Sequence, residues 1–341
     1  MIFADLKTNH EIEKKDQEIA LAAKDGAIKD ERIKSDQNRI KFFIGGTVLL
    51  LVLLGFIIYF LLVKNKNNKL LQDQNNMIED QRASIEHKQT EIIDSINYAS
   101  RIQSAIMPQQ ETLKRQLKDG FVLYIPKDVV SGDFYWTEQL SEHEVLVAVA
   151  DCTGHGVPGA MVSIVCNNAL NRSVREFALN NPAEILDKTR EIVLEEFQQH
   201  DSSVKDGMDI SLALINFKTN ELQWAGANNP LWIIRKENPT IIEEYKADKQ
   251  PIGQFRNAKP FTSHDIKVSI GDRFFLFSDG FADQFGGDKG KKLKNNTLKE
   301  LLIANSNDKM DDNKIILNNA LDQWKGDLEK LDEVLKNLKL I

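Results

Sequence analysis

The sequence predicts an α+β domain in its last two-thirds, preceded by a helical N-terminal region that crosses a membrane once. Strand and helix patterns alternate from residue 111 onward, a charge-free stretch occupies 42–63, and a row of apolar residues at seven-residue intervals follows that stretch. A chain of 341 residues holds about two units at roughly 150 residues per domain. The predicted regions are 1–41, 42–63, 64–110 and 111–341.

Residues 1–41 are dense in charged and amide side chains, contain no proline and have sparse apolar positions. This composition predicts a polar helical stalk, with a solvated, disordered tail as the alternative. The region is too short for a sensor domain. It also lacks the positive, apolar and cleavable layout of a signal peptide.

Residues 42–63 read FFIGGTVLLLVLLGFIIYFLLV and carry no charge. At about 1.5 Å per residue, a helix of this length crosses the roughly 30 Å hydrocarbon core of a membrane. A buried core helix is the alternative, but the run has no polar face to present to water. The stretch therefore predicts a single transmembrane helix.

Residues 64–110 contain no glycine, and no proline before Pro108, which indicates one continuous helix. Its apolar seam has strict seven-residue spacing and then a closer one: Leu71, Ile78, Ile85 and Ile92, followed by Ile96, Ala99, Ile102 and Ile106. This seam predicts a coiled-coil linker and a homodimer formed through 64–110. The companion positions of the first half are polar, so the pairing there is weak, and a lone amphipathic linker helix is the alternative.

The region 111–341 supplies the elements of the α+β domain. Strand patterns occur at 121–125, 145–150, 210–217, 222–226, 231–235 and 273–277, and helix patterns at 159–177, 182–199, 297–305 and 311–324. The polar connection 218–220 is short, and 231–235 follows closely on 222–226. These short links favour antiparallel hairpins over crossover units.

Aspartates recur where apolar strands end. Asp151 follows the buried run 145–150, Asp279 follows 273–277, and two further acids are Asp133 and Asp332. A single aspartate in a turn is usually a cap or turn former, but acids gathered from distant strand ends repel one another unless a cation neutralises them. Oxygen-only ligation suits Mg²⁺ or Mn²⁺ better than zinc. The repetition therefore predicts a metal site.

Seven short motifs follow one another between about residue 106 and residue 341. They are SGDFYW at 131–136, ADCTGHGVPGAMVS at 150–163, GMDISLALINF at 207–217, LQWAGANNPLWIIR at 222–235, PIGQF at 251–255, FLFSDGFADQFGG at 275–287 and LDEV at 331–334. In this ordered set the chain resembles the stage II sporulation E type branch of the metal-dependent (type 2C) protein serine/threonine phosphatases. The resemblance implies a four-layer α-β-β-α sandwich with a metal site at one end of two antiparallel sheets. It also implies hydrolysis of phosphoserine or phosphothreonine on a signalling protein, for example a regulator that antagonises an anti-sigma factor.

The resemblance further implies a site with two Mn²⁺ or Mg²⁺ ions that activate a water for attack on phosphorus. Asp151 would bridge the ions, and Cys152 would contribute its backbone carbonyl. Asp133 would bind one ion directly or through water. Asp279 and Asp332 would hold the other.

Three further features of the motifs are open to two interpretations. Asp209 is expected to serve local structure or a weak accessory ion. His155 is a candidate proton donor to the departing serine or threonine oxygen, and a hydrogen-bonding role in its loop is the alternative. Cys152 is not expected to be a thiol nucleophile, because no arginine follows within a few residues to hold a phosphate.

Composition excludes some classes of function and weakens others. The net charge is −7 and no block rich in lysine and arginine interrupts the chain, so nucleic acid is not an expected partner. Two cysteines do not make a disulfide framework.

Near its end the chain departs from the family, because Glu333 replaces an aspartate and lysines enter 335–339. This departure supports the alternative of a catalytically weak or inactive phosphatase-like module that binds a phosphoprotein and relays a signal.

The expected location is the inner (cytoplasmic) membrane, with the phosphatase domain in the cytoplasm. Phosphoproteins and Mg²⁺ are found there. The cations flanking the span slightly favour a cytoplasmic N-terminus instead. They are Arg32, Lys34, Arg39 and Lys41 before the span and Lys64, Lys66 and Lys69 after it. This difference is small, and acids lie among the early cations.

Overall fold

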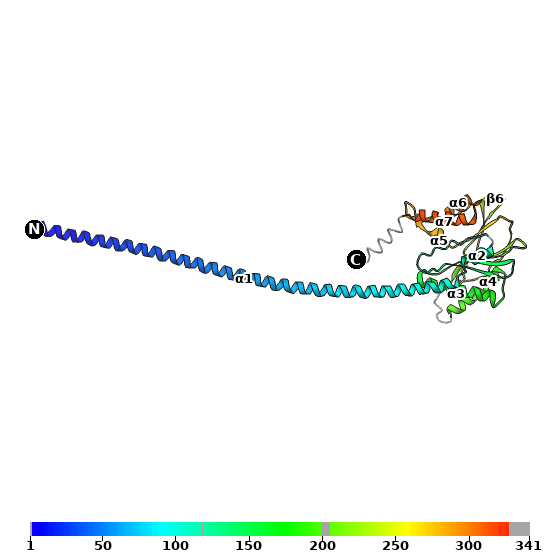
Figure 1. Cartoon of the computed structure of the whole chain (residues 1–341), viewed down its shortest axis with the longest axis horizontal. Helices are drawn as coiled ribbons and strands as arrows, with labels where there is room; N and C mark the ends of the chain where they lie inside the picture. Colours follow the sequence, from blue (N-terminus) through cyan, green and yellow to red (C-terminus); the bar gives the residue numbers. More distant parts are fainter. Residues whose placement is uncertain (1, 118, 199–204, 327–341) are drawn as a thin grey trace. The chain divides into compact units, whose positions relative to one another are not determined.

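The computed structural model describes residues 2–117, 119–198 and 205–326 (Figure 1). They divide into two compact units, Met1–Gln89 and Thr90–Ile341. Helix α1 (Ile2–Ile106) makes up the described part of the first unit, and its last turns belong to the second. Asp332, an expected ligand, and its neighbour Glu333 lie outside the described residues.

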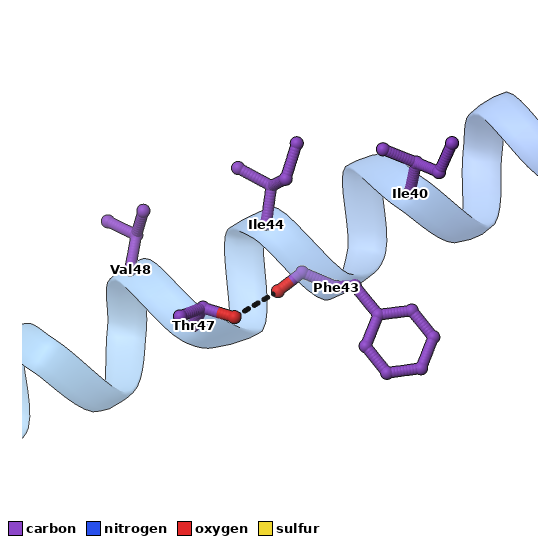
Figure 2. Close-up of a pocket in the computed structure, with 5 residues that line it drawn as sticks. All are labelled: Ile40, Phe43, Ile44, Thr47 and Val48. Atoms are coloured by element: carbon purple, nitrogen blue, oxygen red, sulfur yellow. Dashed lines mark hydrogen bonds between the residues drawn. The ribbon is translucent and has the colours of Figure 1, made fainter.

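The predicted membrane span 42–63 lies within α1, and its large apolar side chains are exposed. Figure 2 shows the start of this segment, where Ile40 and Ile44 lie on one side of the helix and Phe43 points away from them. The Thr47 hydroxyl donates a hydrogen bond to the Phe43 carbonyl (2.7 Å), so it is satisfied without water. Within the described ranges, α1 has the length and composition to cross a membrane. The crossing itself stays a prediction.

The two ends of the predicted coiled-coil seam have different surroundings. Its first part is exposed, as a pairing surface must be: Leu71, Ile78, Ile85 and Ile92. In the second unit, Ile96, Ala99 and Ile106 are half-buried, and Gln103 between them is 3% exposed. Ile102 points elsewhere and is exposed. The end of the seam therefore packs on the chain's own domain.

The second unit contains two main antiparallel sheets. The larger has the order β1-β2-β3-β4-β7, made of Phe134–Gln139, Glu144–Cys152, Met208–Asn216, Glu221–Ala227 and His264–Lys267. The smaller has the order β6-β5-β8, made of Asn238–Tyr245, Leu231–Arg235 and Arg273–Leu276. The antiparallel hairpin predicted around 218–220 is confirmed as β3–β4.

Helices cover the outer face of each sheet. In Figure 1, α3 (Gly156–Arg175) and α4 (Pro182–Gln198) lie side by side, and they bury the larger sheet's outer face. Helices α6 (Lys294–Ala304) and α7 (Met310–Lys325) pack on the smaller sheet's outer face. A third cluster, which includes Trp224 and Ile233, fills the space between the sheets. The short elements are α2 (Gln110–Leu117), α5 (Gly280–Asp283), β9 (Phe285–Gly286) and β10 (Lys291–Lys292). The unit is thus an α+β domain, as the sequence predicted.

Strand β2 is central and is covered on both faces, which confirms the prediction from its uninterrupted apolar run. Leu146 and Ala148 face the helices α3 and α4, whereas Val145 and Val147 face the other sheet. The strand is therefore rigidly held. Its end carries Asp151.

Two expectations about strands were wrong. Residues 121–125 are not a strand, because their alternating apolar side chains, Phe121 and Leu123, pack on the cluster under α6 and α7 instead of joining a sheet. Strands β4 and β5 are not a hairpin, since the connection through Asn228 (φ 58°) carries the chain from one sheet to the other. Edge strands β6 and β7 carried no clear pattern, because β6 is largely exposed and β7 is four residues long.

Candidate metal centre and catalytic site

Asp151 lies near the end of β2 and is paired across the ladder with Asp209 of β3. Side chains of directly opposed residues lie on the same face of a sheet, so two carboxylates meet there. The pKa of Asp151 is raised from 3.8 to about 8. Burial is the largest cause, followed by the charges of Asp133 and Asp279, a hydrogen bond with Asp133 and the charge of Asp209. Without a cation, this carboxyl group is therefore held as the neutral acid.

Asp133 precedes β1 and is held by hydrogen bonds with three other residues, one of them in its own loop. The Ser278 hydroxyl donates to its Oδ2 (2.6 Å), and its own backbone N–H donates to the Ser131 hydroxyl (3.0 Å). The Tyr124 hydroxyl donates to its carbonyl (3.4 Å). The Ser278 contact orients the carboxylate, and the other two hold the backbone of Asp133.

Asp279 follows β8 at the N-terminal end of α5, but its side chain does not cap that helix. Its carboxylate is instead directed to a hydrogen bond with Asp151. Partial burial, then the charge of Asp283, raise the pKa of Asp279, while that hydrogen bond and the charge of Lys292 lower it. The Lys292 ammonium group lies 2.5 Å from the Asp283 carboxylate. Asp283 and Lys292 thus belong to the surroundings of the acid cluster.

Backbone packing brings the loop before β1 against the loop after β2. A Cβ atom at Gly132 would lie 2.8 Å from the Gly154 carbonyl oxygen and 3.0 Å from that of Cys152. Glycine is needed because a side chain would occupy the space beside these carbonyls. The Cys152 carbonyl, expected as a ligand, is therefore next to the segment that carries Asp133.

The Cys152 side chain has no role in this arrangement. It is buried in the core under α3 and α4. Burial, followed by a hydrogen bond with Cys166, raises the pKa of the Cys152 thiol well above 9.0. A protonated, buried thiol is not a nucleophile, in agreement with the expectation from sequence.

Asp209 and His155 differ in how closely they join the cluster. The Asp209 carboxylate accepts a hydrogen bond from Asn228 (2.8 Å), and burial raises its pKa. His155 precedes α3, and its side chain is 83% exposed, with Nδ1 3.6 Å from Asp128 Oδ2. Asp209 thus interacts with Asp151 of the acid cluster, whereas the contact of His155 is with Asp128.

Sequence reasoning missed Asp283, Lys292, Ser278 and Asp128. Asp283 had a usable signal, because it lies four residues after Asp279 and α5 places such residues on one helix face. The other three have no local signature. The partner of Ser278, for example, is 145 positions away in the chain.

The donor set fits a hard divalent cation. Asp133, Asp151, Asp209 and Asp279 present carboxylate oxygens, and burial, followed by the charges of the other three, raises the pKa of Asp151. Oxygen ligands of this kind suit Mg²⁺ or Mn²⁺. In the described part of the chain, no group of three or more Asp, Glu, His or Cys side chains is arranged so that it could hold a metal ion. The ligand assignments therefore stay predictions.

Comparisons with known proteins point in the same direction. The family model described as stage II sporulation protein E (SpoIIE) matches residues 141–329. The chain is 23% identical over 162 residues to the phosphoserine phosphatase RsbP of Bacillus subtilis (strain 168), a match that covers 47% of this chain and 38% of RsbP. It thus spans well under half the length of that relative. The structure of the SiaA-PP2C domain of Pseudomonas aeruginosa is similar with 28% identity and a TM-score of 0.63, over 70% of this chain and 92% of that domain.

Proposed function

Because the chain belongs to the SpoIIE family, we propose that it is a metal-dependent protein serine/threonine phosphatase of the type 2C class. Its substrate is a phosphoserine or phosphothreonine of a signalling protein. The likeness to RsbP, a phosphoserine phosphatase, and to the SiaA-PP2C domain supports this assignment. A regulator that antagonises an anti-sigma factor, the substrate that the resemblance of the motifs implies, is the type of substrate to test first.

One observation carries the proposal: three carboxylates from distant segments converge. Burial of Asp151 on β2, together with the charges of Asp133 before β1 and Asp279 after β8, raises the pKa of Asp151 to about 8. A cluster like this is unfavourable in a protein that binds no cation. Asp151, Asp133 and Asp279 are the described residues that would hold Mn²⁺ or Mg²⁺ ions. The Cys152 carbonyl and Asp332 are the remaining proposed ligands.

When bound, two such ions supply a nucleophile from water at neutral pH and neutralise charge on the phosphoryl oxygens. The chain's own groups set the geometry. Ser278 and Ser131 orient Asp133. Strand β2, which is covered on both faces, holds Asp151 in place. His155, which is exposed and lies beside Asp128, is the proposed proton donor to the departing serine or threonine oxygen, with a hydrogen-bonding role in its loop as the alternative.

The N-terminal half gives the proposal its cellular setting. We propose that 42–63 anchors the protein in the inner membrane and that the phosphatase domain lies in the cytoplasm. The exposed seam from Leu71 to Ile92 supports a homodimer through the linker. Its weak, partly polar character suits a regulated pairing.

The proposed function is tested on the full chain in membrane vesicles, with p-nitrophenyl phosphate and a phosphoserine peptide as substrates. We expect turnover that requires Mn²⁺ or Mg²⁺ and stops with a chelator. Cys152→Ala should retain it, because only the backbone carbonyl is used. Metal binding without hydrolysis would favour the catalytically inactive binding module. Absence of both metal binding and turnover would refute the proposal.

A further inference from the structure

Gln103, in the last turn of α1, is a buried polar residue whose amide group is fully engaged. It is 3% exposed. Its Nε2 donates to the Ser131 carbonyl (2.5 Å) and to the Ser163 hydroxyl (2.9 Å), and its Oε1 accepts from the Ser131 backbone N–H (3.1 Å). The side chain therefore pairs with both backbone groups of Ser131, as a neighbouring strand would.

Ser131 is connected in turn to a proposed metal ligand. Its hydroxyl accepts the hydrogen bond from the Asp133 backbone N–H (3.0 Å), two residues along the chain. Gln103, Ser131 and Asp133 thus form a continuous relay of hydrogen bonds. Ser163 extends it to α3, where its hydroxyl donates to the Ala160 carbonyl. One side chain therefore joins α1, the loop before β1 and the helix after the β2 loop.

We propose that Gln103 is a positioning residue for the metal centre, acting through Ser131 to hold Asp133 where a cation needs it. This inference rests on the proposed function. If the Gln103 amide were removed, the Ser131 N–H and carbonyl would lose their hydrogen-bond partners. The loop would then have to move to find others.

The test compares Gln103→Met with Gln89→Met in the full chain. Methionine keeps the volume and the helix propensity but cannot make the three hydrogen bonds. Gln89 is exposed on the same helix, so it receives the same chemical change without the relay. Mn²⁺ binding is measured by titration calorimetry, and folding by circular dichroism and thermal unfolding without metal.

We expect Gln103→Met to bind Mn²⁺ about 10-fold more weakly than wild type, as is typical when a group that orients a ligand is lost. Gln89→Met should bind as wild type does. In an Asp133→Asn background, Gln103→Met should add little further loss, because the residue acts through Asp133. A purely structural role would give the same extra loss in both backgrounds.

Wild-type affinity for Mn²⁺ in folded Gln103→Met would overturn the inference, and so would full additivity with Asp133→Asn. If Gln103→Met does not fold, Mn²⁺ binding is measured in Ser131→Ala instead. This change removes the hydroxyl that accepts the hydrogen bond from the Asp133 backbone N–H, without altering the core. Unchanged Mn²⁺ binding in folded Ser131→Ala would then overturn it. Failure of the proposed function is distinguishable, because wild type itself would show neither Mn²⁺ binding nor turnover.

Discussion

The Ser278 hydroxyl donates a hydrogen bond of 2.6 Å to Oδ2 of Asp133, although the two residues are 145 positions apart. The bond joins the end of β8, in the smaller sheet, to the loop before β1, in the larger one. Ser278 is also the residue before Asp279. A single contact thus places two proposed ligands from different sheets beside each other, which is the geometry that the predictions below depend on.

Asp151→Asn and Asp279→Asn should each abolish metal-dependent turnover. Either change removes a carboxylate from the cluster without opening a core cavity, so the fold should remain. We expect kcat/KM to fall by more than about 100-fold, since loss of a direct ligand exceeds the loss typical for its supporting groups. Activity is measured with Mn²⁺ and p-nitrophenyl phosphate. Asp265→Asn, at an exposed site in β7 bonded to Gln223, is the matched control. Near-normal activity in either site variant would show that the metal assignment is wrong.

The metal-free protein should lose stability as pH rises. The pKa of Asp151 is about 8 in the fold against an ordinary value of 3.8. Between these values the folded state holds a proton that the unfolded chain has released, so the free energy of unfolding falls with increasing pH. Asp151→Asn cannot ionise, so it should flatten this slope and be the more stable protein near pH 8. Urea unfolding in a chelator, across this pH interval, measures the effect. An identical slope in wild type and Asp151→Asn would contradict it.

The C-terminus should be cytoplasmic, because the proposed substrates are there. An alkaline phosphatase reporter, which is active outside the cytoplasm, is fused after Ile341, and a second fusion places it before Met1. The C-terminal fusion should be silent. Strong activity from it would reverse the topology and remove the expected substrates.

Activity should depend on the rotational phase of α1. The helix has no proline or glycine between the predicted span and Pro108 to absorb a rotation, and Gln89 is the last residue of the first unit. One residue inserted after Gln89 turns the following helix by about 100°, whereas seven residues restore the seam to within about 20°.

The seven-residue insertion should therefore keep regulated activity in membranes. The one-residue insertion should hold the activity constantly high or constantly low, because a changed dimer geometry would favour one of two states of the domain. Both variants are assayed in the same vesicles with the same metal. Equal activity in both insertions and wild type would mean that the helix is a passive tether.

Some features of this protein were predictable because they depend on local sequence. The run from Val145 to Ala150 is apolar without alternation, which predicted a strand covered on both faces, and the structure buries both faces of β2. An aspartate directly after such a run is expected near the end of the strand, and Asp151 lies there. The charge-free segment and the seven-residue spacing similarly predicted one long helix. In each case, periodicity along the chain contains the needed information.

Other features depended on which distant segments meet, so the tertiary structure alone decided them. Asn228 takes the chain from β4 to a different sheet, a choice that short spacing did not reveal. Gln103 looked like an ordinary polar position in a helix. It becomes a buried partner of Ser131 because α1 ends against that loop. The sequence by itself determined that the strands would end in acids. Only packing determined which hydroxyl and amide groups orient those acids, since a hydrogen bond requires its donor and acceptor to be brought within about 3 Å.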